Sequence, residues 1–155
     1  MKLTRAIELI LVGGARSRVK IHLSLLSWAR RKDLVLVGKF IEARLQKKYG
    51  IYISHKAHVP SSTDFPHPIA VVIGEGVRLG ENVTIYQNVT LGGARRGDWQ
   101  AGNYPDVGAD TVIFAGAVVV GKVRIGRGCI IGANAVVTKD VPDFATAVGV
   151  PAKVL

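Results

Sequence analysis

The residue best suited to chemistry in this chain is His67, which lies between Pro66 and Pro68. The proline that follows it favours an extended backbone at His67, so its imidazole is presented at a fixed angle. Because an unperturbed imidazole has a pKa of about 6.5, such a side chain can accept a proton from a hydroxyl group at neutral pH. The local sequence leaves open the alternative that His67 only fills a turn.

A second set of candidate side chains lies in the segment 93–106. Trp99 and Tyr104 could contact an acceptor molecule, whereas Arg95 and Arg96 could bind an acidic sugar or a phosphate. A long loop that projects from a regular scaffold is an expected place for function. These residues could equally be solvated or pack on a neighbouring subunit, and the sequence does not decide between the two.

The elements that must position these residues follow a six-residue period. Over 73–93 and again over 107–142, each unit begins with an aliphatic residue and continues with small and polar ones. This period predicts a parallel β-helix, in which three units make one coil and the aliphatic residues stack into a continuous core. Two units near the start are spaced by eight residues, from Phe65 to Ile73, which predicts an irregular corner around His67.

The first fifty residues have a different pattern. Apolar residues recur at helical spacing over 4–12, 19–31 and 34–48, and Gly50 follows in the usual C-cap position. We therefore predict a helical region over 1–50 that covers one end of a β-helix over 51–155. An alternative is that these basic helices form an amphipathic surface that contacts a membrane.

Composition narrows the partners and the compartment. The formal net charge of +10 favours anionic partners, such as a phosphate-bearing cofactor, an acidic polysaccharide or an anionic membrane surface. No nucleic-acid-binding module is recognisable, so nucleic acid is not expected as a partner. The single Cys129 offers no disulfide framework, and no segment has the pattern of a signal peptide or a membrane span. We expect a cytoplasmic protein, at the inner face of the membrane if its basic helices touch lipid.

From about Tyr49 to Leu155 the chain resembles the hexapeptide-repeat acyltransferases, most closely the serine acetyltransferase branch with its polysaccharide O-acetyltransferase relatives. The resemblance implies a left-handed parallel β-helix, a homotrimer with sites between subunits, and direct transfer of acetyl from acetyl-CoA to a hydroxyl group. The segments that carry it are His67-Pro-Ile-Ala-Val-Val-Ile-Gly-Glu75, Gln87-Asn-Val-Thr-Leu-Gly-Gly93 and Val148-Gly-Val-Pro-Ala-Lys153.

Residue roles follow from the same resemblance. His67 matches the general base of the family, and a backbone N–H near Gly92 or Gly93 would polarise the thioester carbonyl. Gly93, Ala115 and Ala133 match positions that line the coenzyme A groove, although packing at the corners of the β-helix would explain these small residues equally well. Candidates for orienting His67 are Asp64, Asp106 and Tyr52.

Three positions depart from the serine acetyltransferase pattern. Tyr52 replaces the Asp that pairs with the base, Pro66 replaces an Asp beside it, and Tyr104 replaces a His before a Pro. These changes remove groups that orient the base or bind the amino and carboxylate groups of serine. We therefore predict a sugar hydroxyl in surface polysaccharide biosynthesis as the acceptor, contacted by Tyr52, Trp99 and Tyr104, with serine as the alternative.

Two other classes of protein could be built on a β-helix of this kind. A zinc enzyme on this fold would need three histidine ligands spread along the coils, but no His follows residue 67, so no metal site is predicted. An inactive trimeric scaffold is compatible with the three departures. The retained His67 and the small residues of the cofactor groove argue against a scaffold.

Overall fold

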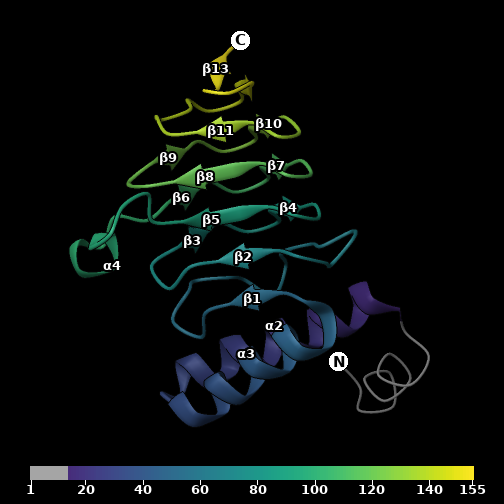
Figure 1. The fold of residues 1–155 in the computed structure, drawn as a ribbon. Coiled ribbons are helices and arrows are strands. Elements are labelled where there is room, and N and C mark those ends of the chain that lie inside the picture. Colours follow the sequence, from purple (N-terminus) through teal and green to yellow (C-terminus); the bar gives the residue numbers. More distant parts are fainter. Residues whose placement is uncertain (1–13) are drawn as a thin grey trace.

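The computed structural model describes residues 14–155, as a column of short strands that stands on two helices (Figure 1). The helices are α2 (Ala15–Arg31) and α3 (Val35–Tyr49). The predictions of helices over 19–31 and 34–48 are confirmed, and α3 ends at Gly50 as expected. The helix predicted over 4–12 lies outside the described residues.

Apart from one four-residue helix in a loop, short strands make up the rest of the regular structure. They are β1 (Tyr52–Ile53), β2 (Val72–Ile73), β3 (Arg78–Leu79), β4 (Thr84–Ile85), β5 (Thr90–Gly92), β6 (Asp106–Val107), β7 (Val112–Ile113), β8 (Val118–Val120), β9 (Arg124–Ile125), β10 (Ile130–Ile131), β11 (Val136–Val137), β12 (Thr146–Val148) and β13 (Lys153–Val154).

The strands form three sheets. The first sheet has the order β1-β2-β5-β8-β11, the second β3-β6-β9, and the third β4-β7-β10-β12-β13. Pairing is parallel except between β12 and β13, and Val72 pairs with Thr90, three six-residue units further along the chain. Because the chain passes from one sheet to the next and then returns one coil higher, the prediction of a parallel β-helix is confirmed.

The core is the column of aliphatic side chains that the six-residue period predicts. Burying each of them stabilises the fold by about 1.5–3 kcal/mol relative to leaving it in water. Along the first sheet, the inward-facing residues, each at most 1% exposed, are Ile53, Ile73, Leu91, Val119 and Val137.

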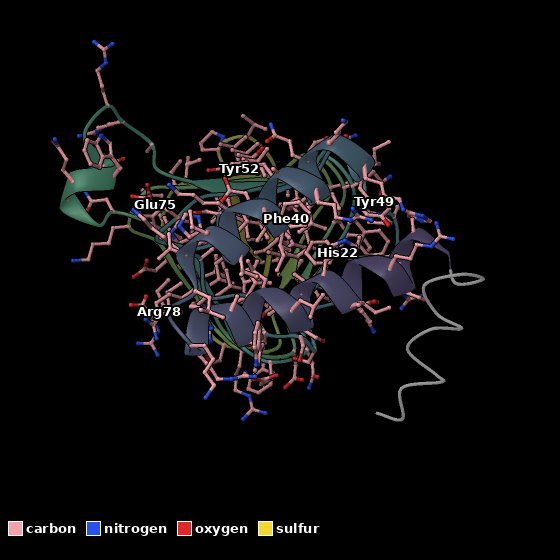
Figure 2. The ribbon with its side chains drawn as sticks, turned by 90° about the horizontal axis from the view of Figure 1, so that it is seen from below. His22, Phe40, Tyr49, Tyr52, Glu75 and Arg78 are labelled. Atoms are coloured by element: carbon pink, nitrogen blue, oxygen red, sulfur yellow. The ribbon has the colours of Figure 1, made fainter. Side chains whose placement is uncertain are left out.

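The two helices cover the first coil at one end of the column. Figure 2 views the molecule from this end, where α2 and α3 lie side by side. Val19 and Leu23 of α2 and Leu45 of α3 are fully buried, because one face of each helix packs into the core cluster of the β-helix. The helices therefore form the predicted cap. Neither is long and apolar enough to cross a membrane, nor is any other helix within 14–155.

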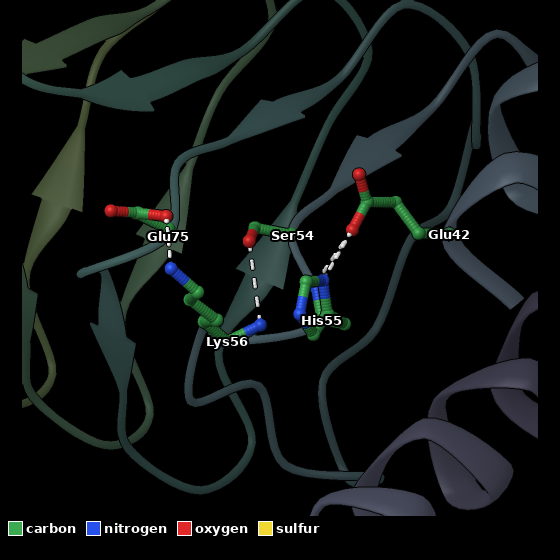
Figure 3. A network of polar contacts seen from close by, with 5 residues as sticks. All are labelled: Glu42, Ser54, His55, Lys56 and Glu75. Carbon is green, nitrogen blue, oxygen red and sulfur yellow. Dashed lines mark hydrogen bonds and ion pairs between the residues drawn. The ribbon is translucent and has the colours of Figure 1, made fainter. Parts of the chain in front are cut away.

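A polar network fastens α3 to the first coils (Figure 3). One carboxylate oxygen of Glu42 accepts hydrogen bonds from the backbone N–H of His55 at 3.0 Å and pairs with its ring Nδ1 at 2.9 Å. One residue further, Lys56 Nζ lies 3.0 Å from a carboxylate oxygen of Glu75 in the next coil. The contacts of Glu42 fix how α3 sits on the β-helix, whereas the Lys56–Glu75 pair joins two successive coils. Tyr49 and Lys48 at the end of α3 line the candidate site.

Candidate active site

His67 lies in the irregular corner that the sequence predicts. Phe65 and Ile73 are both buried although eight residues separate them, and the chain between them turns outward. The backbone N–H of Ile69 donates to the carbonyl of His67 at 2.8 Å, and Ala70 adopts a left-handed conformation with φ of 52°. This tight turn leaves the side chain of His67 exposed.

Two aromatic rings continue from His67 along this corner. The ring of Tyr86 lies 6.1 Å from that of His67, centre to centre, and is tilted by 53°. Phe114, one coil higher, stacks on Tyr86 at 5.1 Å with an interplanar angle of 13°. The stacked pair therefore limits where the imidazole can move on one side. We call this line of corners, between the third and first sheets, the His67 edge.

Ala115 and Ala133, which the resemblance assigns to the cofactor groove, lie on the same edge. Ala115 follows Phe114 in the corner after β7, and Ala133 lies one coil higher, in the corner after β10. The carbonyl of Ala115 accepts the N–H of Asn134 at 2.9 Å, so successive corners are hydrogen-bonded to one another. Ala115 is half-buried and Ala133 is exposed. Their small side chains add little bulk to the edge above His67.

The helical cap forms one wall of the pocket at His67. The pocket has a volume of about 470 Å³ and is lined by residues of both parts, including Lys48, Tyr49, His67 and Ile69. Lys48 Nζ lies over the Tyr49 ring, 5.6 Å from its centre, and Lys48 is exposed. A cation from α3 therefore shares a pocket with the imidazole.

Asp64, a candidate for orienting His67, is occupied by the cap instead. Its carboxylate accepts from Arg16 Nε at 2.8 Å and Nη2 at 2.5 Å, and Lys20 Nζ lies 3.4 Å away. The hydrogen bond from Arg16, followed by the charge of Lys20, holds the pKa of Asp64 below its ordinary value, although partial burial opposes this shift.

The other two candidates for orienting the base lie elsewhere on the β-helix. Asp106 is on β6 in the second sheet, where it pairs in register with Arg78 and Arg124. Tyr52, on β1, lies beside Glu42 and does not line the pocket at His67. Burial, followed by the charge of Glu42, raises the pKa of Tyr52.

The loop between β5 and β6 leaves the opposite edge of the first sheet, and its short helix α4 (Asp98–Ala101) projects from the column (Figure 1). Asp98 organises it: the buried carboxylate accepts the backbone N–H groups of Ala94 and Arg95, each at 2.7 Å, and Nδ2 of Asn103 at 3.0 Å. These bonds, that from Asn103 above all, lower the pKa of Asp98. A side chain at Gly93 would place its Cβ 2.9 Å from Cβ of Asp98, so this close packing explains Gly93 without a cofactor.

Tyr104 and Trp99, the predicted acceptor contacts in the loop, have different environments. The Tyr104 ring lies against Gly74 and Gly76, so closely that a Cβ on Gly76 would fall 2.1 Å from its Cδ2. Burial, followed by the charge of Glu75, raises the pKa of Tyr104. Trp99 is 63% exposed on α4. Tyr104 therefore packs the loop against the β-helix, whereas the side chain of Trp99 is exposed to solvent.

One chain does not bring all the predicted residues together. His67, Ala115 and Ala133 lie on the His67 edge, whereas Gly93 and the loop leave the other edge of the first sheet. In Figure 1 the loop with α4 is on the left, and the corners that follow β4 and β7 are on the right. A single site with all these residues would need the loop of a second chain beside the His67 edge.

Sequence reasoning did not find several residues that shape the site. Lys48 and Arg16 belong to the cap, and no local signal relates them to His67. Tyr86 was visible only as an aromatic residue in a corner position of a repeat unit. Asp98 could have been suspected, because a carboxylate that opens a short helix after a glycine often accepts backbone N–H groups. Within 14–155, no three His, Cys, Asp or Glu side chains are grouped to hold a metal ion.

The comparisons with known proteins agree with this geometry. Residues 104–139 match the family model "Bacterial transferase hexapeptide (six repeats)". The chain is 35% identical over 149 residues to a serine acetyltransferase of Bacillus pumilus, covering 96% of this chain and 67% of that protein. It is 41% identical over 128 residues to the enzyme of Staphylococcus xylosus, covering 79% and 58%. A solved serine acetyltransferase in complex with CoA superposes with a TM-score of 0.75 at 29% identity, covering 86% and 54%.

These relatives correct the prediction of the acceptor. The sequence favoured a sugar hydroxyl in polysaccharide biosynthesis, but the relatives at 35% and 41% identity, as well as the structural neighbour, are serine acetyltransferases. The prediction of a glycan acceptor was wrong, because the departures at Tyr52, Pro66 and Tyr104 did not exclude serine acetyltransferases as the relatives of this chain. The chain spans about half to two thirds of the length of these proteins. It belongs to the hexapeptide-repeat acyltransferase family, with serine acetyltransferases as its homologues.

Proposed function

We propose that the chain is an acetyl-CoA-dependent O-acetyltransferase whose acceptor is serine. The observation that carries this proposal is the position of His67, exposed in a pocket that it shares with Lys48 and supported on one side by Tyr86. The similarity to serine acetyltransferases supports the reaction class and the acceptor.

His67 would act as a general base. Its imidazole would take the proton from the serine hydroxyl as the oxygen attacks the thioester carbonyl. The carbon–sulfur bond then breaks, and the imidazolium returns the proton to the leaving thiolate, which gives O-acetylserine and free CoA. No covalent acyl-enzyme is needed, so the site requires a base and a donor for the oxyanion rather than a Ser or Cys nucleophile.

Lys48 would bind the carboxylate of the acceptor. Two other cations of the cap, Arg16 and Lys20, are already paired with Asp64. Lys48 is exposed on the wall that faces the pocket and contacts the neutral ring of Tyr49. An ammonium group in this position can attract a carboxylate, which suits an amino acid acceptor.

We further propose that the complete site forms between subunits of a homotrimer of left-handed β-helices, in the cytoplasm, where acetyl-CoA is available. The His67 edge of one chain, with Ala115 and Ala133, would face the loop edge of its neighbour, with Gly93 and Trp99. This arrangement would place the small residues of both edges along the groove that holds acetyl-CoA. Residues 1–50 would form the cap unit and 51–155 the catalytic unit.

The test is thiol release from acetyl-CoA with L-serine, by wild type, His67→Ala and the control His58→Ala, with CoA binding measured separately by calorimetry. His58 lies beside Arg78 of the second sheet, away from the His67 edge. We expect His67→Ala to lose about 10²- to 10⁴-fold in kcat while it retains CoA binding, and His58→Ala to remain active. A wild-type protein that binds CoA but shows no serine-dependent turnover would overturn the proposal.

A further inference from the structure

The outer face of the helical cap carries large apolar side chains that the described part of the chain leaves uncovered. Leu25 and Trp28 of α2 are 48% and 44% exposed, and Leu36 and Phe40 of α3 are 82% and 64% exposed. Within each helix the two residues are three or four positions apart, so they lie on one face. With Val37, 38% exposed, they form what we call the cap patch.

The cap patch lies at one end of the molecule. The buried residues of both helices, such as Leu23 and Leu45, face the β-helix, so the cap patch occupies the opposite side. Figure 2 looks onto this end, where Phe40 lies over α3. The residues of the cap patch lie on both sides of the turn that joins α2 to α3, at Lys32 to Leu34. Several large, exposed apolar side chains at one end of a molecule indicate an interaction site.

The helices that carry the cap patch have an excess of positive charge, which determines the kind of partner that can bind there. Between residues 15 and 49 there are ten Lys and Arg residues, against only Asp33 and Glu42. Arg16 and Lys20 pair with Asp64, and Arg30 donates to the carbonyl of Ala57, so these three bind the β-helix and do not count toward the charge around the cap patch. Glu42 is bound to His55 on the side facing the first coil, so it does not offset the cations on the outer face. Two copies of this cap would repel each other in a symmetric contact, because each would present the same positive surface. An anionic partner is favoured.

We propose that the cap patch docks the protein on an anionic membrane surface, with Trp28, Leu36 and Phe40 entering the headgroup region and the surrounding cations binding lipid phosphates. An apolar face that includes an aromatic residue, bordered by Lys and Arg, is the pattern of helices that lie in the plane of the interface. Anionic lipid attracts each cation near the surface by about 1 kcal/mol. This inference does not depend on the acceptor of the enzyme.

The test is co-sedimentation of the full chain with phosphatidylglycerol vesicles and with phosphatidylcholine vesicles. Two matched double variants are compared, Leu36→Ser/Phe40→Ser on the cap patch and Leu155→Ser/Phe144→Ser at the other end. Their exposed fractions match, with 82% for both leucines and 64% and 69% for Phe40 and Phe144. A second readout is the emission of Trp28 in a Trp99→Phe background, because these are the only two tryptophans.

We expect binding to phosphatidylglycerol only, weakened by salt, with a blue shift of the Trp28 emission. The cap variant should bind at least about tenfold more weakly, and the control variant as wild type. Equal binding by both double variants would overturn the proposal, since charge alone would then be sufficient. Absence of vesicle binding would also overturn it, and so would self-association that only the cap variant loses, which would assign the cap patch to a second copy of the chain.

Discussion

Arg16 of α2 binds Asp64 of the first coil through two parallel contacts, Nε to Oδ1 at 2.8 Å and Nη2 to Oδ2 at 2.5 Å. Although 48 residues separate them, this pair fixes the beginning of α2 beside the corner that carries His67. The cap therefore contributes to the geometry of the site as well as covering the end of the core. Two-point Arg–carboxylate pairs combine charge with directionality, which makes this contact a good target for mutation.

Replacing Asp64 by Asn should destabilise the fold by about 1 kcal/mol at neutral pH. Because the folded pKa of Asp64 is below its unfolded value, its contribution is fully present above the unfolded pKa of about 3.8 and is lost as the pH falls through the folded value. Urea unfolding at pH 7 and at successively lower pH measures this difference. The Arg16→Gln variant, alone and combined with Asp64→Asn, completes a double-mutant cycle. A coupling energy near zero between Arg16 and Asp64 would show that their contact does not stabilise the fold.

Replacing Lys48 by Gln should raise the KM for serine about tenfold and leave kcat nearly unchanged, because the ammonium contributes to binding in the ground state and the transition state alike. The control is Lys47→Gln, which removes a neighbouring charge on α3 from a side chain that does not line the pocket. Steady-state kinetics with varied serine distinguish the two variants. Equal KM values in both would show that the carboxylate binds elsewhere.

Replacing Tyr86 by Ala should lower kcat about tenfold, because the ring that limits the motion of His67 is removed. The Tyr86→Phe variant keeps the ring and its stacking on Phe114, so it should recover most of the activity. The two variants are compared by kcat and by the affinity for CoA. If Tyr86→Phe were as impaired as Tyr86→Ala, the phenolic hydroxyl and not the ring would be the important group.

Replacing Asp98 by Ala should loosen the loop, since three N–H donors lose their acceptor. Trypsin cleavage after Arg95 and Arg96 then becomes about tenfold faster, in line with the free energy of hydrogen bonds to a charged group. The control Gln100→Ala changes an exposed residue of the same short helix. Unchanged cleavage of the Asp98 variant would mean that other contacts hold the loop closed.

Replacing Gly76 by Ala should destabilise the fold by about 1–3 kcal/mol, because the new methyl group would occupy the position of the Tyr104 ring. A Tyr104→Ala change in the same chain removes the clash, so the double variant should be less destabilised than the sum of the single ones. Gly92→Ala is the control, since a Cβ there meets no atom within 4 Å. Thermal unfolding of the wild type and the four variants measures these effects, and additive effects of Gly76→Ala and Tyr104→Ala would contradict the prediction.

The sequence predicted the β-helix well because its core repeats locally: each aliphatic residue, such as Ile73 or Ile85, can be assigned from its own six-residue unit. The irregular corner at His67 was equally visible from the spacing of Phe65 and Ile73. The partner of Asp64 was not predictable, because Arg16 lies in another element and only the docking of the cap brings them together. The acceptor was mispredicted for a related reason. The residue types at Tyr52 and Tyr104 do not show how the rings pack, and only the structure shows that the ring of Tyr104 lies against Gly74 and Gly76.

The contact of α3 with β1 has a consequence for assembly. A β-helix ends in strands whose N–H and C=O groups are open on one side, and such edges can pair with another chain. Because α3 packs along β1, the end of the first sheet is shielded from the end of a second column. The helical cap thereby opposes the end-to-end stacking of β-helices into a fibre, because a second column cannot add its strands at this end.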